Sequence, residues 1–437
     1  MVVQLDVTVV NVAAKSIGTA LGGGVAELQW VVNAYTISFA SLILTAGATG
    51  DRIGAKRTFT VGFAIFLLAS LGCAIAPDIE ILIASRAVQG LGAAILVPCS
   101  LALLNHAYPE EQERMHAIGI WAAGASVALA AGPVIGGMLI AVVGWRSIFF
   151  INLPLGLAGI WLTWRYAEET PRTKRGLDYF GQVFAVVVLA AMAAAIIEAG
   201  AVGWRNVWVL AGFAATLLCG AAFVWVEYKG RHPMLPLSFF KDRTFSSATV
   251  IGWLVNVAYY GLIFVLSLFF QEVKSYSALK TGLAFVPMTA IVLIANLSAS
   301  RISGWIGPRF TLLSGQALFG VGCFTLLRIS SGTSYTHMIF QLLAIGAGIG
   351  LMVPPMTSVL LGAVEKKHSG IASGVLNSAR QTGSVLGVAL FGSLIAVRTR
   401  FIAGFHTALL ISTLAVFIGC SLSLLVGAKG ERHAARI

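Results

Sequence analysis

The sequence predicts an all-α polytopic membrane protein, and this prediction rests first on composition. Apolar residues make up 58% of the 437 residues and charged residues only 11%, whereas soluble domains carry about 25% charged residues. The chain also holds 48 glycines, a residue that membrane helices tolerate well. A soluble enzyme, a disordered chain, a collagen and a secreted disulfide scaffold are therefore excluded as classes.

The length and spacing of the apolar segments predict the architecture. A helix rises about 1.5 Å per residue and the hydrocarbon layer is about 30 Å thick, so one crossing needs roughly 20 residues. We expect fourteen spans, of which the first is short. They are residues 1–14, 30–49, 58–76, 81–104, 116–141, 147–166, 180–199, 207–227, 244–270, 282–302, 310–327, 336–361, 372–396 and 405–426. The polar stretches between them are too short to fold as domains.

Lysine and arginine fall mainly on one side of this predicted bundle. With both termini in the cytoplasm, 19 of the 29 basic residues lie in cytoplasmic segments, 8 lie outside, and Arg86 and Arg380 lie within spans. The positive-inside rule predicts this bias for cytoplasmic termini. It also explains the formal net charge of +12 by contact with the lipid bilayer, so no nucleic-acid partner is expected.

Two parts of the chain repeat at a nearly constant separation. Residues 50–56, after the second span, and residues 303–309, after the tenth, both keep the pattern Ile-Gly-x-basic. The Gly-x-Gly of residues 90–92 recurs at 346–348. The repeat predicts two six-helix halves with a substrate site between them, which is a transporter plan. The expected domains are an N-terminal half at 1–166, a linker with two inserted helices at 167–243, and a C-terminal half with a short cytoplasmic tail at 244–437.

Signatures of enzymes and of ATP-driven pumps are missing from the sequence. No lysine follows a glycine, so the chain has no P-loop, and it contains neither GxSxG nor HExxH. The five cysteines lie in apolar stretches without CxxC spacing and predict buried thiols. We therefore expect no enzyme activity, no cofactor and no metal. An ion gradient or the substrate's own gradient would drive transport.

Several motifs resemble those of one transporter family. Residues 47–57 (GATGDRIGAKR) are similar to the signature loop between helices 2 and 3 of the major facilitator superfamily. Further stretches resemble the fourteen-span drug/proton antiporter branch of this superfamily. They are residues 5–13 (LDVTVVNVA), 86–92 (RAVQGLG), Gly124 with 132–137 (GPVIGG), 145–156 (WRSIFFINLPLG) and 378–383 (SARQTG). The resemblance covers the whole chain and implies a major facilitator fold.

The signature loop combines one acid, three bases and two glycines in a short stretch. Its glycines allow close approach, and Asp51 could cap the next helix or bind a base across the interface of the halves. The alternative is an ordinary cytoplasmic loop. The resemblance implies a gate that stabilises one access state, formed by Gly50, Asp51, Arg52, Gly54, Lys56 and Arg57.

Asp6 and Arg86 are the most informative pair of residues. Both are ionisable side chains within spans, and the predicted depths allow them to meet. An unpaired charge in hydrocarbon costs about 3 kcal/mol or more, and such residues commonly mark proton or substrate routes. Either the pair is purely structural, or Asp6 alternates between a protonated state and a state paired with Arg86. The second interpretation makes this pair the proton-coupling site.

Further candidates lie in spans 5, 9 and 13. The span 5 glycines could serve packing alone, but in the family their pattern is typical of antiporters and implies export. The residues of spans 9 and 13 could line a substrate cavity, pack in the core, or, for Arg380, reach the cytoplasmic edge. The antiporter-motif residues are Gly124, Gly132, Pro133, Gly136 and Gly137, and the candidate cavity residues are Asn256, Tyr259, Tyr260, Asn377, Arg380 and Gln381.

The first span departs from the family pattern. Family members usually have more of this helix before the Leu-Asp motif, whereas this chain begins four residues before Leu5 and the predicted span ends at residue 14. Lys15 also stands where the family usually has a proline. Two explanations are open, namely a start site upstream of Met1 or a truncated first helix.

Together these observations predict proton-coupled efflux of small, amphipathic or drug-like compounds across the inner (plasma) membrane by alternating access. The partners would be the substrate and protons, and a periplasmic adaptor protein is a further partner that the sequence leaves open. The alternative is a dedicated exporter of one endogenous metabolite, such as a siderophore, an antibiotic or an amino acid. A membrane-bound enzyme or a sensor would need a catalytic constellation or an output domain, and the sequence shows neither.

Overall fold

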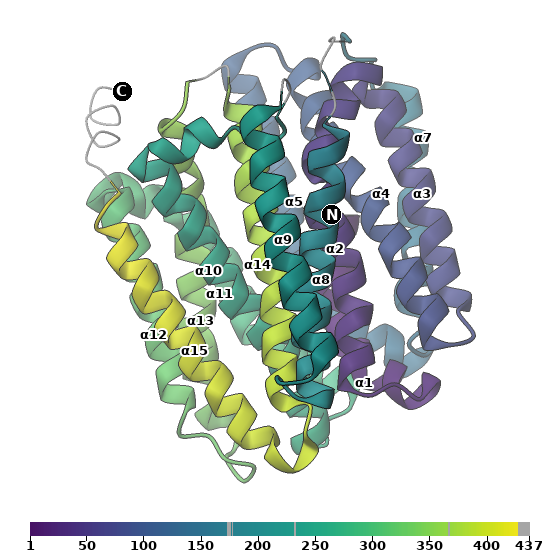
Figure 1. The fold of residues 1–437 in the computed structure, drawn as a ribbon, viewed down its shortest axis with the longest axis vertical. Helices are drawn as coiled ribbons and strands as arrows, with labels where there is room; N and C mark the ends of the chain where they lie inside the picture. Colours follow the sequence, from purple (N-terminus) through teal and green to yellow (C-terminus); the bar gives the residue numbers. More distant parts are fainter. Residues whose placement is uncertain (173–175, 177, 231–232, 366–367, 427–437) are drawn as a thin grey trace.

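A computed structural model describes residues 1–172, 176, 178–230, 233–365 and 368–426, and the regular elements in these ranges are all helical (Figure 1). The predicted C-terminal tail from residue 427 and part of the predicted linker lie outside the described residues. A first group of helices comprises α1 (Val2–Leu21), α2 (Val25–Ile53), α3 (Ala55–Ile75), α4 (Ile79–Ala107), α5 (Glu111–Val142), α6 (Ser147–Phe150) and α7 (Asn152–Tyr166). We call it the N-terminal group.

Two helices follow, and then a second group. The two are α8 (Tyr179–Val202) and α9 (Val207–Lys229). The second group, called the C-terminal group, begins after the short helix η1 (Leu237–Lys241). It comprises α10 (Arg243–Leu268) with its continuation η2 (Phe269–Val273), α11 (Ala278–Ile306), α12 (Pro308–Leu326), η3 (Tyr335–His337), α13 (Ile339–Gly362), α14 (Ser369–Ile395), η5 (Arg398–Arg400) and α15 (Phe401–Ser423).

Each of the fourteen predicted spans coincides with helical structure, so the all-helical prediction is confirmed. Eleven of these helical segments, among the described residues, are long and apolar enough to cross a membrane. The three long helices outside that set are α1, α12 and α14. Polar side chains interrupt α1 and α14, among them Asp6 and Lys15 in α1 and Arg380 in α14. A count of fourteen crossings therefore stays a prediction.

Helix α1 extends further than the sequence predicted. The expected end at residue 14, with Lys15 as its outer edge, is wrong, because the helix continues to Leu21 and ends at Gly22 with a positive φ of 76°. Lys15 remains inside the helix because its ammonium group has partners in the C-terminal group. It donates a hydrogen bond to the carbonyl oxygen of Gln271 at 2.7 Å and lies 3.5 Å from a carboxylate oxygen of Glu272.

The helix ends fall at two ends of the bundle, which we name after the turns they contain. The Gly54 end holds the turn between α2 and α3, and the Gly22 end holds the turn between α1 and α2. Gly54 has a φ of +110° and Gly307, at the turn between α11 and α12, has a φ of +83°. Both are single residues between two long helices, and glycine adopts this backbone conformation without a steric cost.

The same correspondence extends to helix packing. A Cβ atom on Gly92 of α4 would lie 2.7 Å from the backbone nitrogen of Phe66 in α3, and one on Gly348 of α13 would lie 2.7 Å from that of Phe319 in α12. Phe66 and Phe319 are 253 residues apart, as are Gly54 and Gly307. Equivalent small residues therefore bring equivalent helices into backbone contact in the two groups.

Helices α8 and α9 lie beside the boundary between the groups (Figure 1). Helix α8 packs against both α2 and α14, while α9 packs on α8. Leu189 and Ala193 of α8 share an apolar cluster with Ile37 of α2 and Val385 of α14. The inserted pair thus contacts the seam, which we define as the contact surface between the N-terminal and C-terminal groups.

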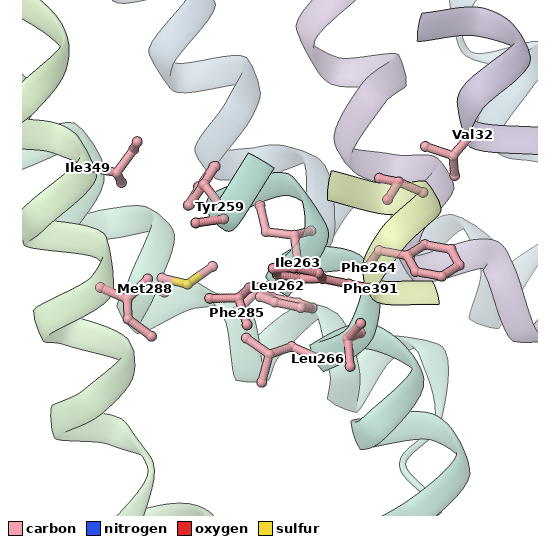
Figure 2. Close-up of a cluster of buried hydrophobic side chains, with 14 of the residues drawn as sticks. Val32, Tyr259, Leu262, Ile263, Phe264, Leu266, Phe285, Met288, Ile349 and Phe391 are labelled. Atoms are coloured by element: carbon pink, nitrogen blue, oxygen red, sulfur yellow. The ribbon is translucent and has the colours of Figure 1, made fainter. Parts of the chain in front are cut away.

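The largest apolar core surrounds α10. Figure 2 shows Tyr259 and Ile263 of α10 beside Phe285 and Met288 of α11, with Phe391 of α14 on another side. Helix α10 contacts α1 across the seam and α13, α14 and α15 within its own group. Helix α10 therefore connects the seam with the core of the C-terminal group.

Candidate functional site

Asp6 and Arg86 form a buried ion pair. Nη1 of Arg86 donates a hydrogen bond to Oδ2 of Asp6, and each side chain is only 1% exposed. Helix α1 supplies the acid and α4 the base, and both lie inside the N-terminal group. The predicted meeting of these two side chains is confirmed.

Neutral amides complete the environment of the Asp6 carboxylate. Its second oxygen, Oδ1, accepts hydrogen bonds from Nε2 of Gln89 at 2.9 Å and from Nδ2 of Asn152 at 3.0 Å. The Gln89 amide also accepts from Nη1 of Arg86 at 2.6 Å and donates to Oγ of Ser70 at 2.8 Å. Helices α1, α3, α4 and α7 thus converge on one carboxylate.

Helix α2 holds the other side of Arg86. Nε donates to the carbonyl oxygen of Val31 at 3.0 Å, and the ring of Tyr35 lies 4.3 Å from the guanidinium carbon. Hydrogen bonds and a cation–π contact therefore stabilise the cation in addition to its partner acid. Asp6 could gain or lose a proton without leaving Arg86 devoid of partners.

The signature loop is shorter than predicted and is braced by a different residue. The helices continue to Ile53 and begin again at Ala55, so Gly54 alone forms the turn. The expectation that Asp51 caps the next helix is wrong, because the first N–H groups of α3 find acceptors in the segment after α7. Oγ1 of Thr170 accepts from Ala55 at 2.8 Å, and the carboxylate of Glu169 accepts from Lys56 at 2.9 Å.

The charges of the loop are arranged around this contact. The Glu169 carboxylate lies 3.7 Å from Nε of Arg57, and Nζ of Lys56 donates to the carbonyl oxygen of Trp164 at 3.2 Å. Gly54 leaves the space that Glu169 occupies, because a Cβ atom there would lie 2.5 Å from the carboxylate. Gly50 is buried within α2, and Arg52 is exposed. The loop is thus tied to residues 164–170 of its own group.

The glycines of α5 allow close packing in two directions. A Cβ atom on Gly132 would lie 1.8 Å from Oγ1 of Thr8, and one on Gly136 would lie 2.8 Å from a side-chain carbon of Val9, so this stripe packs α5 against α1. Gly137 faces the C-terminal group, where a Cβ atom would lie 2.8 Å from a backbone oxygen of α11. Gly124 lies beside Met1, and Pro133 lies inside the helix.

A small cavity lies on the seam. Its volume is about 10 Å³, roughly the space of one water molecule. Thr8 and Asn11 of α1, Pro133 of α5, Tyr259 of α10 and Thr289 of α11 are among the residues that line it. The Tyr259 hydroxyl and Oδ1 of Asn11 are buried without a hydrogen-bond partner. The cavity is therefore polar enough to hold water but too small for an organic substrate.

The seam is tied together towards the Gly22 end. Besides the Lys15 contacts, Oγ of Ser267 in α10 donates to the carbonyl oxygen of Asn11 at 2.6 Å. Nε2 of Gln29 in α2 donates to the carbonyl oxygen of Val388 in α14 at 2.9 Å. Nearer the middle, Oγ1 of Thr289 reaches a carbonyl oxygen of α5 at 3.2 Å. The hydrogen bonds that α1, α5, α10 and α11 form across the seam thus lie at the middle of these helices or closer to the Gly22 end.

The six candidate cavity residues lie on two neighbouring helices, α10 and α14. Only Tyr259 among them lines the seam cavity, and its ring centroid lies 5.3 Å from that of Tyr260. Asn256 is buried and donates to a carbonyl oxygen of its own helix. Asn377 also donates within its helix, and Arg380 and Gln381 are partly exposed.

The sequence profile of the Major Facilitator Superfamily matches residues 1–179 and again residues 175–388. The chain belongs to the major facilitator superfamily. It is therefore a multi-pass membrane transporter and not an enzyme. This assignment agrees with the resemblance found in the motifs and with a structure in which all regular elements of the described ranges are helices.

Relatives within the superfamily are named for drug resistance. A methylenomycin A resistance protein of Streptomyces coelicolor is 35% identical over 431 residues, covering 99% of this chain and 91% of the relative. One of Bacillus subtilis is 36% identical over 411 residues, covering 92% and 87%. The multidrug resistance protein Stp of Mycobacterium tuberculosis is 36% identical over 393 residues, covering 90% and 73%.

Sequence reasoning missed several members of the site. Gln89 and Asn152 lie in motifs that pointed to the superfamily, but neutral amides carry no charge that demands a partner. Glu169 lies outside the signature loop that it braces. A usable signal was present for Gln89, since it stands one helical turn after Arg86 and must share its face.

Proposed function

We propose that this superfamily member exports small, amphipathic organic compounds from the cytoplasm in exchange for protons, by alternating access. The Asp6–Arg86 pair is the observation that carries the proposal, because a carboxylate and its partner are enclosed together at membrane depth. Ionisable groups in such positions commonly form proton routes. The relatives, named for drug resistance, support export as the direction of transport.

Helix α1 offers a physical link between the proton and the substrate pathway. Asp6 faces the interior of the N-terminal group, while Thr8 and Asn11 on the same helix line the seam cavity and Lys15 binds η2, the continuation of α10. Protonation of Asp6 removes its charge attraction to Arg86 and loosens α1 from α4. A shift of α1 would then act directly on its contacts across the seam.

The contacts near the Gly22 end support a state closed to the outside. The excess of lysine and arginine in segments at the Gly54 end favours the cytoplasm on that side and cytoplasmic termini. In this arrangement Lys15, Ser267 and Gln29 hold the external side shut, and substrate enters between the groups from the cytoplasm. The small seam cavity would be the closed inner limit of that route.

The two groups would act as the moving halves of the transporter, at residues 1–166 and 244–437. The structural repeat around Gly54 and Gly307 supports this division. Helices α8 and α9, within residues 167–243, would be an inserted pair against the seam. The braced Gly54 turn would act as a gate element in which Glu169 stabilises the turn in the present state. With α1, α12 and α14 included, the chain would cross the plasma membrane fourteen times.

Transport by purified protein in liposomes tests the proposal. With an acidic lumen and neutral medium, a compound that exchanges for protons should accumulate inside the vesicles against its gradient. Protein-free liposomes control for passive trapping of weak bases, and nigericin should abolish the accumulation by collapsing the pH gradient. Accumulation that survives nigericin would contradict proton coupling, and a broad compound panel with no accumulation would contradict export.

A further inference from the structure

Arg380 and Arg86 both lie within predicted membrane spans, but they differ in their partners. It stands near the middle of α14 (Ser369–Ile395), roughly 16 Å along the axis from the start of that helix. Within the ranges that the structure describes, Arg380 forms no hydrogen bond and no ion pair, and its Nε atom is buried without a partner. Arg86, in contrast, binds Asp6, Gln89 and Val31.

A buried guanidinium nitrogen without an acceptor, such as Nε of Arg380, is energetically unfavourable. Buried donors in folded proteins nearly always have an acceptor, and an unsatisfied charged donor costs more than a neutral one. The described charged side chains that are themselves buried are Asp6, Arg86 and Glu227. Asp6 and Arg86 neutralise each other, and Glu227 accepts from the N–H of Leu235 near the end of α9. None of these groups neutralises Arg380.

Arg380 lies beside the surface of α14 that packs on α10, because its Cγ atom would lie 3.5 Å from a Cβ atom on Gly252 of that helix. Ser378 donates to a carbonyl oxygen of α2 at 3.0 Å, Val385 packs with α8, and Gly383 lies against the backbone of α10. Asn377, Arg380 and Gln381 stand together between these contacts at helical spacing of three and four residues. All three side chains are partly exposed.

We propose that Arg380 binds an anionic group, most simply a carboxylate, on the exported compound, and that the transporter therefore prefers anionic over neutral or cationic amphiphiles. This inference rests on the export function proposed above. It names the chemical class of the substrate, which the superfamily assignment leaves open.

The chemistry of the surrounding side chains fits such a ligand. A guanidinium presents parallel N–H donors that match the two oxygens of a carboxylate. The amides of Asn377 and Gln381 offer further donors on the same face. Tyr260, on the neighbouring α10, lies near Arg380 and stacks edge-on with Tyr259, with ring centroids 5.3 Å apart. These rings would receive the apolar body of an amphiphile, whereas a cationic head group would be repelled.

The test is equilibrium binding of three matched probes to detergent-purified full-length protein. The probes are N-dansyl-6-aminohexanoate, its primary amide and dansylcadaverine, which carry negative, zero and positive charge on similar bodies. We expect wild-type protein to bind the carboxylate at least about tenfold more tightly than the amide, because a charge-assisted contact is lost in the amide. Arg380→Gln should remove this preference, and Arg380→Lys should keep part of it.

Arg301→Gln is the matched control, since Arg301 is an exposed arginine in α11, and it should keep the wild-type preference. If Arg380→Gln does not fold, Arg380→Lys and the wild-type comparison still decide the question. Wild-type protein that binds the carboxylate no better than the amide, or does not bind it, overturns the proposal. So does an Arg380→Gln variant that keeps the preference. The binding assay imposes no pH gradient. A failure of proton-driven export would therefore leave the binding result unchanged, so the two proposals can be tested separately.

Discussion

At the scale of single residues, the enclosed pair of Asp6 and Arg86 is stable only as a unit. Taking each charge out of water carries a large desolvation cost, which the partner charge and the surrounding hydrogen bonds offset. Gln89, Asn152 and the carbonyl oxygen of Val31 satisfy the remaining hydrogen-bonding capacity. Removing one charge should therefore be worse for stability than neutralising both.

Arg86→Gln should lower the free energy of unfolding by about 3 to 5 kcal/mol, because it leaves an uncompensated buried carboxylate. The double variant Asp6→Asn with Arg86→Gln should recover part of this loss. Unfolding midpoints in detergent for the single and double variants measure the coupling. A double variant that is less stable than Arg86→Gln alone would refute the ion pair as the source of the effect.

The pair itself could be predicted from sequence because isolated charges within apolar spans require partners, and the chain supplies few of them. Its amide neighbours could not be predicted in the same way. A neutral side chain such as Asn152 can be satisfied within its own helix, as Asn256 and Asn377 are in this structure. Only the packed position of α7 shows that Asn152 reaches Asp6.

At the scale of elements, two helices can pack closely where a glycine leaves space for the neighbouring helix. Helix α5 approaches α1 along a stripe that includes Gly132, and it carries another glycine, Gly119, with open space around it. The sequence indicated the stripe through its spacing. It could not show which neighbouring helix each glycine faces, because that depends on the tertiary arrangement.

Gly132→Ala should destabilise the protein by about 1 to 3 kcal/mol, because the added methyl group would overlap Thr8. Gly119→Ala is the control within the same helix and should be neutral or stabilising by up to about 1 kcal/mol. Combining Gly132→Ala with Thr8→Ala should restore part of the stability. Equal effects of the two glycine substitutions on the unfolding midpoint would disprove this account of α5 packing.

Glu169→Ala should also destabilise the transporter, by about 0.5 to 2 kcal/mol, because the first N–H groups of α3 lose their acceptor. The neighbouring Glu168 is exposed, so Glu168→Ala controls for loss of charge in the same segment. The unfolding midpoint of Glu169→Ala should be lower than that of Glu168→Ala. If Glu168→Ala has the larger effect, the brace at the Gly54 turn is not the reason for stability.

Helix boundaries show where sequence reasoning reaches its limit. Apolar length predicted a helix in all fourteen places, but it ended the first one at residue 14. The next residue, Lys15, has its partners Gln271 and Glu272 in η2, 256 and 257 residues away in the chain. The loop after α2 was predicted too long for a similar reason. Its charged residues look like a solvated connector until Glu169 and Thr170 supply acceptors for α3.

At the scale of the whole molecule, the repeat was the most productive feature of the sequence. It related turns and packing contacts that the structure then placed in equivalent positions of the two groups. The sequence could not show how the groups meet, because seam contacts such as Gln29 with Val388 join unrelated positions of the repeat.

The proposed orientation predicts which segments can be labelled in intact cells. In a cysteine-free background, Ser331→Cys, between α12 and α13 at the Gly22 end, should react with a membrane-impermeant maleimide. Asn105→Cys, at the end of α4 near the Gly54 end, should react only after the cells are permeabilised. Both positions are exposed. The opposite labelling pattern would reverse the orientation and, with it, the assignment of the closed end.

Proton coupling through Asp6 is the central claim, and substrate-dependent proton movement measures it most directly. Liposomes with a pH-sensitive dye in an acidic lumen should show alkalinisation when wild-type protein takes up a transported compound. In Asp6→Asn this signal should fall to the level of protein-free liposomes, while the variant still binds the compound. Glu198→Gln, an exposed acid in α8, should behave as wild type. An undiminished signal from Asp6→Asn would contradict the claim.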